Sequence, residues 1–374
     1  MKIAILIPVR SGGSLGYIKH LTEIVPKMLQ NKVVERISIF VPEKTLIGLH
    51  IPGVDLHLVA HDDYKTGFRE MGELAEAGEY DVALCTTARA VPLLRCPIIY
   101  MVQNIEPIQK PSYSMPLKWR VRLWLLRREH AMAFKRATGI IAISNFSKSQ
   151  ICQRFYIQPK DVHVVYHGFD PGESASSVKP DLSIPKEGFI FSAGSIVPYR
   201  GYEDIIRALA VLLSSGAKIL PVIFAGSVNS YAKSYERSLR SLARSLKVED
   251  FIIWAGGLQR NEMTWCYQNA RLFIQTSRAE AFPNILVEAM GHGCVSVSCD
   301  HPPMPEIFQD AALYYPTGDS DALAQRIKMV LEMNQEETEK RHTITRLRSS
   351  FFSWDKCAND TLEVLQQVVQ GCQK

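Results

Sequence analysis

Two glutamates, Glu280 and Glu288, flank a short apolar stretch in SRAEAFPNILVEAMGHG, residues 277–293. Two carboxylates in this arrangement can act as an acid–base pair, ligate a metal ion, or accept hydrogen bonds from hydroxyl groups at the two ends of one long polar ligand. The residue types leave these three kinds of site open. A fourth interpretation, in which both side chains are solvated on an amphipathic helix, also stays open at this point.

The residues between the two glutamates have the pattern of a helix start. Pro283 is tolerated in a first turn, and Asn284 is the expected cap. Free backbone amides at a helix start bind anions, because the positive end of the helix dipole lies there. Since eight helical residues span about 12 Å, the pair is suited to a ligand with hydroxyls at its ends and an anionic middle. A nucleotide diphosphate sugar has that form.

A third candidate is Arg200 in GSIVPYRGYED. A predicted strand ends at Gly194, and Arg200 comes just before an amphipathic segment. A guanidinium at such a loop suits a phosphate, because it makes paired, charge-assisted hydrogen bonds to the oxygens. The alternative is a solvated arginine.

Other motifs favour structural roles. Asp319 and Asp321 form a D-x-D, but the segment after them is helical in pattern, which favours a helix cap over a metal site. His163 and His167 lie in a strand pattern and do not share a helical face as zinc ligands would. The glycines near the N-terminus lack the G-x-G-x-x-G spacing of a dinucleotide-binding loop, which argues against a dehydrogenase.

Short apolar runs alternate with amphipathic segments along the whole chain, which predicts parallel strands covered on both faces. In the first half the predicted strands are Ile3–Ile7, Val34–Phe40, Val82–Cys85, Ile98–Val102, Gly139–Ile143 and Val162–Tyr166. In the second half they are Phe189–Ser192, Ile219–Phe224, Phe251–Trp254, Leu272–Gln275 and Val295–Ser298. A segment rich in Pro, Ser and Gly separates the two series and has the composition of a linker.

The expected fold class is therefore α/β, with two doubly wound, Rossmann-like domains that face a central cleft. We place the N-terminal domain at residues 1–170, the linker at 171–187 and the C-terminal domain at 188–350. The C-terminal segment, 351–374, is expected to form a helix, with its core at Trp354–Val369, that crosses back to the first domain.

The composition limits the class of protein. The chain has 374 residues, 47% hydrophobic residues and a net charge of +5, which fits two globular domains and gives no indication of a nucleic-acid partner. Its eight cysteines include no C-x-x-C pair, which favours free thiols in a reducing compartment. The N-terminal MKIAILIPVR is interpreted as a buried first strand, and no apolar stretch approaches the roughly 20 residues of a membrane span. We therefore expect a cytoplasmic protein.

The landmarks along the chain resemble those of the retaining, GT-B-fold glycosyltransferases of family four. The segment SRAEAFPNILVEAMGHGCVSVS is similar to their E-x7-E motif. The other segments follow in family order and are RSGGSLGYIKHL, IIAISNFSKSQI, VVYHGFD, AGSIVPYRGYEDIIRAL, VIFAGS, FIIWAGGLQRNEMTWCYQNA, MPEIFQDAALYY and SFFSWDKCANDTLEVL. The resemblance covers essentially the whole chain.

The resemblance implies a role for several residues. Glu280 would contact hydroxyls of the transferred sugar, and Glu288 would contact the ribose. Arg200 and the backbone amides at Asn284, Ile285 and Leu286 would hold the diphosphate. Gly12 and Gly13 would approach the donor phosphate or the acceptor, and the loop with Gly257 and Leu258 would lie against the nucleobase. Members of the family need no metal ion, so the nucleotide diphosphate sugar would be a co-substrate without a further cofactor.

Two parts of the candidate site, the diphosphate clamp and the acceptor side of the first domain, depart from the family pattern. An arginine usual after the second-domain glycine is replaced by Ser195, and a lysine is replaced by Arg200. A histidine usual at the acceptor side of the first domain is replaced by the amides of Gln103 and Asn104, of which Asn104 is the candidate to orient the sugar. These departures keep open a non-catalytic subunit that binds nucleotide or serves as a scaffold.

A basic segment, residues 118–136, contains seven Lys or Arg against one Glu, a net +6. Tryptophans accompany these charges, and a basic helix with tryptophan is typical of contact with an anionic membrane surface. The predicted contact residues are Lys118, Trp119, Arg120, Arg122, Trp124, Arg127 and Arg128. The alternative is a helix that packs in the first domain with solvated arginines.

These observations predict a metal-independent enzyme that moves a hexose-type sugar from a nucleotide diphosphate sugar to a glycan or lipid-linked glycan, with retention of configuration. Bacterial surface polysaccharide biosynthesis, including lipopolysaccharide, at the inner face of the cytoplasmic membrane is the expected setting. A glycoside hydrolase or phosphorylase is a further alternative. It requires two carboxyl groups about 5–9.5 Å apart around one glycosidic bond.

Overall fold

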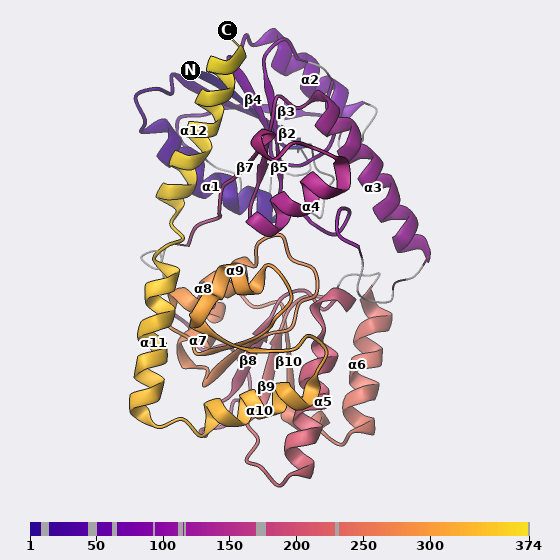
Figure 1. Ribbon diagram of the computed structural model, residues 1–374, viewed down its shortest axis with the longest axis vertical. Coiled ribbons are helices and arrows are strands. Elements are labelled where there is room, and N and C mark those ends of the chain that lie inside the picture. Colours follow the sequence, from indigo (N-terminus) through magenta and orange to yellow (C-terminus); the bar gives the residue numbers. More distant parts are fainter. Residues whose placement is uncertain are drawn as a thin grey trace. The chain divides into compact units, whose positions relative to one another are not determined.

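The computed structural model describes residues 1–8, 15–43, 51–61, 66–92, 94–110, 115, 117–169, 177–228 and 232–372 (Figure 1). The chain forms two units, each built on its own parallel sheet. The first unit contains Met1–Lys110, Pro116–Gly168 and Ser353–Lys374, and the second contains Pro111–Met115 and Phe169–Phe352. The predicted linker, 171–187, lies partly outside the described residues.

The sheet of the first unit has the strand order β3-β2-β1-β4-β5-β6-β7, and every neighbouring pair is parallel. Its strands are β1 Lys2–Leu6, β2 Arg36–Pro42, β3 Asp55–Val59, β4 Val82–Cys85, β5 Ile98–Val102, β6 Gly139–Ala142 and β7 Val162–Val164. Its helices are α1 Leu15–Leu29, α2 Gly67–Ala77, α3 Leu117–Arg136 and α4 Asn145–Phe155, joined by the C-terminal α12, Trp354–Cys372.

The sheet of the second unit has the order β10-β9-β8-β11-β12-β13 and is also parallel throughout. Its strands are β8 Ile190–Ala193, β9 Val222–Ala225, β10 Ile252–Gly256, β11 Leu272–Gln275, β12 Ser296–Cys299 and β13 Ala312–Tyr315. Its helices are α5 Tyr202–Ser214, α6 Lys233–Ser245, α7 Arg260–Asn269, α8 Asn284–Gly291, α9 Met304–Phe308, α10 Ser320–Leu331 and α11 Gln335–Ser349.

Both sheets are doubly wound, so the predicted fold class is confirmed. The central strands are continuous apolar runs, and all residues of β4, β5, β8 and β11 are buried, as expected for parallel strands covered on both faces. In each sheet the order in which successive strands are added reverses between two neighbouring strands, β1 and β4 in the first and β8 and β11 in the second. Ligands bind at such positions in doubly wound sheets, outside the carboxyl ends of the strands.

Two strands lie outside the predicted set, and both are at an edge of their sheet. In β3 three of the five side chains are exposed, and β13 has only partly buried tyrosine at its centre. The exposed side chains of β3 break the apolar run that marks a central strand, whereas β13 is a short apolar run, ALYY, that the predicted set does not include. The strand predicted at Val34–Phe40 in fact begins at Arg36, and the one predicted to end at Tyr166 ends at Val164.

The C-terminal helix α12 belongs to the first unit and packs against α1, which confirms its predicted return. Lys27 of α1 pairs with Asp355 of α12 at 2.9 Å. The backbone of Trp354 leaves room only for a glycine at position 168, where an added Cβ would lie 2.2 Å from the Trp354 nitrogen.

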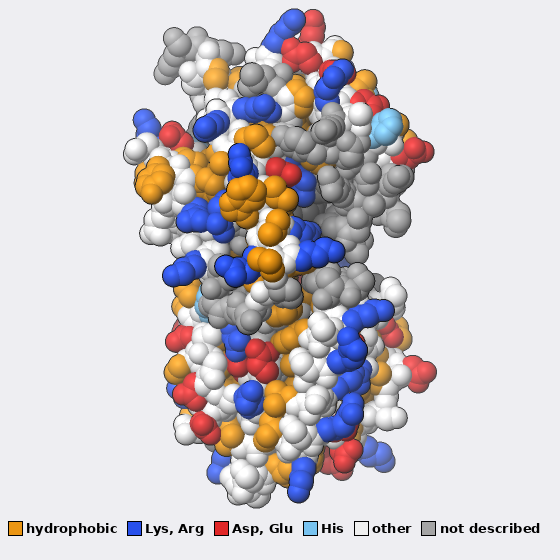
Figure 2. Space-filling model, turned by 90° about the vertical axis from the view of Figure 1, so that its right-hand side faces the viewer, with side chains coloured by type: hydrophobic (Ala, Val, Ile, Leu, Met, Phe, Trp, Pro, Cys, Tyr) orange, Lys and Arg blue, Asp and Glu red, His pale blue; other side chains and the backbone are white. Residues whose placement is uncertain are grey.

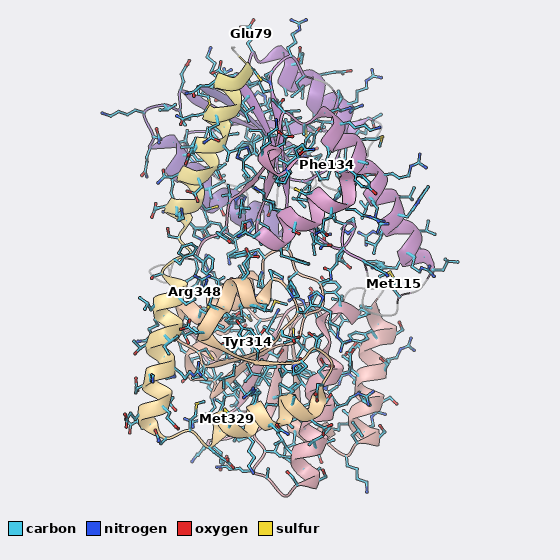
Figure 3. All side chains as sticks on the ribbon, viewed as in Figure 1. Glu79, Met115, Phe134, Tyr314, Met329 and Arg348 are labelled. Atoms are coloured by element: carbon cyan, nitrogen blue, oxygen red, sulfur yellow. The ribbon has the colours of Figure 1, made fainter. Side chains whose placement is uncertain are left out.

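In the second unit Arg348, labelled near the end of α11 in Figure 3, donates to the carbonyl of Ile307 at 2.7 Å.

Candidate functional site

The candidate residues of the second unit gather at its switch point. Ser195 and Arg200 follow β8, and Glu280 follows β11, so both loops leave neighbouring strands at their carboxyl ends. This is the place in a doubly wound sheet where a ligand can reach backbone and side chains from two loops at once. The sheet topology therefore explains why residues about 80 positions apart meet.

Two glycines allow the loop after β8 to fold onto the loop after β11. Gly194 has φ +122, and an added Cβ would lie 3.0 Å from the guanidinium of Arg200. Gly201 has φ +65, and an added Cβ would lie 2.7 Å from the carbonyl oxygen of Thr276. Both positions combine a left-handed backbone with a close approach, and only glycine meets both demands without strain.

Arg200 and Glu280 form a direct ion pair between Nη1 and Oε1. The two side chains are 15% and 11% exposed. Arg200 Nη1 also donates to Ser277 Oγ at 3.2 Å, and Gln275 Nε2 donates to the same hydroxyl at 3.1 Å. The predicted sugar contact and the predicted phosphate contact are thus one polar cluster.

Burial raises the pKa of Glu280, and the positive charge of Arg200 opposes this shift, together with hydrogen bonds from Ser277 and Gln275. A buried charge is tolerated only when it is paired and hydrogen-bonded. The cluster meets that condition before any ligand binds. It offers a cation and an acceptor side by side, which suits a ligand that carries a phosphate next to hydroxyl groups.

The helix with the second glutamate, α8, begins at Asn284, with Pro283 at the cap position and no side-chain capping bond. The prediction that Asn284 is the cap is therefore wrong, because Pro283 takes that place and the helix starts at Asn284, one residue earlier than predicted. The amide of Asn284 donates to the Phe282 carbonyl at 3.0 Å, and that of Leu286 to the Pro283 carbonyl at 2.9 Å. The amides predicted to hold the diphosphate thus lie in the first turn of α8.

Glu288 is half-buried on α8 and accepts a hydrogen bond from the hydroxyl of Tyr267 at 3.1 Å. Tyr267 is buried on α7, and its ring stacks on His292 with an interplanar angle of 13°. Burial, followed by the charge of Glu288, raises the pKa of Tyr267 well above its usual value, so the phenol stays a donor. This contact could not be predicted from the sequence, because Tyr267 has the pattern of an ordinary core aromatic.

The loop predicted to lie against the nucleobase is open. Strand β10 ends at Gly256, which has φ +68, and its carbonyl accepts a bond from the Gly226 amide at 2.7 Å. Gly257 is exposed, and an added Cβ there would meet no heavy atom within 4 Å. Leu258 is half-buried. The loop therefore has space beside its backbone.

The first-unit candidates have less structural support. Gly12 and Gly13 lie outside the described residues. Asn104 follows β5, is exposed, and its side-chain oxygen accepts a bond from the Glu106 amide at 3.0 Å. Gln103 donates to the Thr86 carbonyl at 3.2 Å. Asn104 belongs to the first unit and Glu280 to the second.

The D-x-D motif is a helix cap, as predicted. Asp319 Oδ1 accepts a bond from the Ala322 amide at 2.9 Å at the start of α10.

Across the residues that the structure describes, no three His, Cys, Asp or Glu side chains are grouped so as to hold a metal ion. Nor does any helix in those ranges combine the length and apolar composition needed to cross a bilayer.

Two family models match this chain. The model for Glycosyltransferase Family 4 matches residues 53–173, and that for Glycosyl transferases group 1 matches residues 176–346. The chain is 23% identical over 251 residues to the O-antigen chain mannosyltransferase RfbU of Salmonella typhimurium, covering 67% of this chain and 65% of that protein. It is 24% identical over 233 residues to the O-antigen chain mannosyltransferase B of Escherichia coli, covering 60% and 59%. The matches span less than two thirds of the length of these two relatives.

The structure is similar to that of Anabaena Alr3699/HepE in complex with UDP-glucose. The TM-score is 0.73 at 20% identity, over 98% of this chain and 100% of the other. A structural similarity at 20% sequence identity establishes the fold alone. With both family models matched in chain order, the chain belongs to the group 1, family 4 glycosyltransferases and has their GT-B fold.

Proposed function

We propose that this chain transfers a hexose-type sugar from a nucleotide diphosphate sugar to a glycan or lipid-linked glycan, with retention of configuration and without a metal ion. The observation that carries the proposal is the Arg200–Glu280 pair at the switch point of the second unit. A hydrolase would need the two glutamates around one glycosidic bond. Glu280 instead pairs with a cation, while Glu288 is held by Tyr267 on another helix.

In the proposed reaction the bond between the anomeric carbon and the diphosphate breaks, and an acceptor hydroxyl bonds to that carbon and releases its proton. Arg200 stabilises the charge that develops on the departing nucleoside diphosphate. Glu280 accepts hydrogen bonds from the sugar hydroxyls, and Glu288 accepts them from the ribose. UDP-glucose binding by the Anabaena protein and the mannosyltransferase names of the two bacterial relatives support a hexose donor.

The test is a calorimetric and thermal-shift screen of UDP-, GDP-, ADP- and dTDP-sugars, with EDTA present, followed by transfer assays. We expect Glu288→Ala chiefly to raise the donor KM and Glu280→Ala chiefly to lower kcat. Glu249→Ala is the matched control, because Glu249 pairs with Arg244 on the exposed surface of the same unit. Unchanged kinetics in both site variants refute the assignment. Tight nucleotide binding without transfer favours the non-catalytic alternative.

We further propose that α3 contacts an anionic membrane surface, which places the enzyme at the inner face of the cytoplasmic membrane beside a lipid-linked acceptor. One side of α3 packs inward through the buried side chains of Leu123, His130 and Phe134. The opposite side carries exposed Leu117, Val121, Trp124 and Leu125, which are 72%, 49%, 49% and 51% exposed. Positions i, i+4, i+7 and i+8 share one helical face.

Basic residues flank this apolar stripe. By helical periodicity Lys118 and Arg122 lie along one side of it, and Arg120 and Arg127 along the other. Arg122 lies 4.5 Å over the ring of Trp119, and Arg128 lies 4.9 Å over that of Trp124. Arg127 also donates to the Pro107 carbonyl at 2.7 Å. Figure 2 faces the side on which α3 lies and shows hydrophobic side chains with Lys and Arg around them. An apolar stripe between basic flanks is typical of interfacial helices.

Vesicle co-sedimentation tests the membrane contact. We expect binding to vesicles with anionic lipid to fall at least tenfold when Val121, Trp124 and Leu125 are replaced by Ser. The control neutralises Lys233, Arg237 and Arg244 of α6, which lie on one helical face without an apolar stripe. Binding by the α3 variant equal to that of the wild type, with a loss only in the α6 variant, would mean charge attraction alone and would refute an apolar contact through α3.

A further inference from the structure

We propose that Arg278 is a positioning residue for the Arg200–Glu280 pair, because it ties the loop after β11 to the first turn of α5. The inference rests on the proposed function for its kinetic readout and on the ligand-free protein for its structural readout. Arg278 lies two residues before Glu280 in the motif that bears it. Its guanidinium is turned to α5.

The guanidinium of Arg278 bridges two carboxylates of α5. Nη1 lies 2.9 Å from Glu203 Oε1, and Nη2 lies 2.6 Å from Asp204 Oδ1. The side chains of Arg278 and Asp204 are 15% and 3% exposed. A planar fork can serve two acceptors in fixed directions at once, which a lysine ammonium on a flexible stem cannot reproduce.

Two tyrosines from other elements fix the carboxylates in turn. The hydroxyl of Tyr315 on β13 donates to Asp204 Oδ2 at 3.1 Å, and that of Tyr235 on α6 donates to Glu203. Burial raises the pKa of Asp204, and the charge of Arg278 is the first influence that opposes it. Loss of the guanidinium would leave a buried carboxylate without its cation, which is costly. In this arrangement Arg278 is paired with both carboxylates, and Glu203 and Asp204 each accept a further hydrogen bond from a tyrosine.

The same residue also holds the two catalytic loops together through the backbone. The amide of Arg278 donates to the Tyr199 carbonyl at 2.7 Å, one residue before Arg200. The hydroxyl of Thr276 donates to the carbonyl of Arg200 itself. Arg278 thus connects the Arg200 loop by its amide and the start of the following helix by its side chain. Both members of the ion pair depend on this connection for their separation.

A small displacement here has a large kinetic effect. Misplacing a catalytic group by about 1 Å can lower a rate on the order of a hundredfold. If Arg278 only stabilised the second unit, its loss would lower the melting temperature and leave kcat per folded molecule unchanged. If it positions the pair, kcat falls while the donor KM changes little, because Glu288, the proposed ribose contact, lies on α8 and is held by Tyr267 of α7.

The variant is Arg278→Lys, which keeps the charge but cannot hold both carboxylates at once, and Arg278→Met is the companion that removes the charge. The control is Arg244→Lys, because Arg244 pairs with Glu249 at 3.2 Å on the exposed surface of the same unit. We expect Arg278→Lys to lower kcat at least tenfold with KM within about threefold. We expect Arg244→Lys to leave both constants unchanged.

The second readout is hydrogen exchange on the ligand-free protein. In Arg278→Lys the amides of 197–201 and 276–281 should exchange faster, and those of β8 and β11 should not. Unchanged exchange in the two loops, or an unchanged kcat in a folded variant, overturns the proposal. If the wild type binds no nucleotide and transfers no sugar, the proposed function fails, and the exchange rates alone still decide whether Arg278 holds the two loops.

Discussion

The contact between Tyr267 and Glu288 leads to a prediction about donor affinity. Tyr267→Phe removes one hydroxyl and keeps the ring that stacks on His292. Glu288 Oε2 then loses a donor that lies 3.1 Å away. A hydrogen bond to a charged group contributes about 1.5–3 kcal/mol. Because Glu288 is half-buried and water can replace part of the bond, the low end of this range applies.

This loss corresponds to about a tenfold change in an equilibrium constant. Glu288 is proposed to hold the ribose in the ground state and the transition state alike, and removal of such uniform binding raises KM without lowering kcat. We therefore expect Tyr267→Phe to raise the donor KM about tenfold and to keep kcat within about twofold of the wild type. Steady-state kinetics and isothermal calorimetry with the preferred donor measure the two effects.

The matched control is Tyr314→Phe, which deletes a hydroxyl that donates to the Gln309 carbonyl at 2.7 Å on the exposed edge of the same unit. It should leave KM unchanged. Equal KM values for Tyr267→Phe, Tyr314→Phe and the wild type would refute the reasoning. A lower kcat at unchanged KM in Tyr267→Phe would assign Glu288 to the chemical step instead of to ribose binding.

Two further predictions concern stability. Gly201→Ala should cost roughly 1–3 kcal/mol, because it adds a Cβ beside the Thr276 carbonyl at a left-handed φ; Gly216→Ala, at φ +67 with open space around it, should cost less in the same urea titration. Burial, and then the charge of His167, holds the pKa of His20 well below 6.5, so stability is full above that pH and falls as the pH drops below it. The slope of the urea midpoint between about pH 8 and pH 5 should be shallower in His20→Gln, and an equal slope in both proteins would contradict this account.

Sequence reasoning was most accurate where a single local property decides the structure. The strands Val82–Cys85, Ile98–Val102 and Leu272–Gln275 have the predicted limits, because a buried parallel strand is a continuous apolar run. The cap at Asp319 followed from its place before a helical pattern. The edge strand Asp55–Val59 was missed because three of its five side chains are exposed and only Val59 is buried, so it carries no such run.

The residues of the candidate site also differ in how well they can be predicted from the sequence. Arg200, Glu280 and Glu288 could be selected by residue type, spacing and family resemblance. The contacts that hold these three residues could not be predicted, because Tyr267 and Arg278 bind partners that lie 21 and 75 positions away along the chain. A tyrosine in a helix and an arginine beside a glutamate have many possible partners, and only the packing of the folded unit decides which of these partners they contact.

What the sequence can predict about the site is limited for a physical reason. A ligand contact must present a particular chemical group at the carboxyl edge of the sheet, so its residue type is visible in the sequence. A positioning contact needs only some donor or acceptor at the right distance, and several residue types from several elements can supply it. Arg278 shows the difference, since it lies within the motif and carries the charge expected of a phosphate contact, yet Glu203 and Asp204 bind its two terminal nitrogens. Its neighbours in space, and not those in sequence, decide that it orders the site instead of touching the ligand.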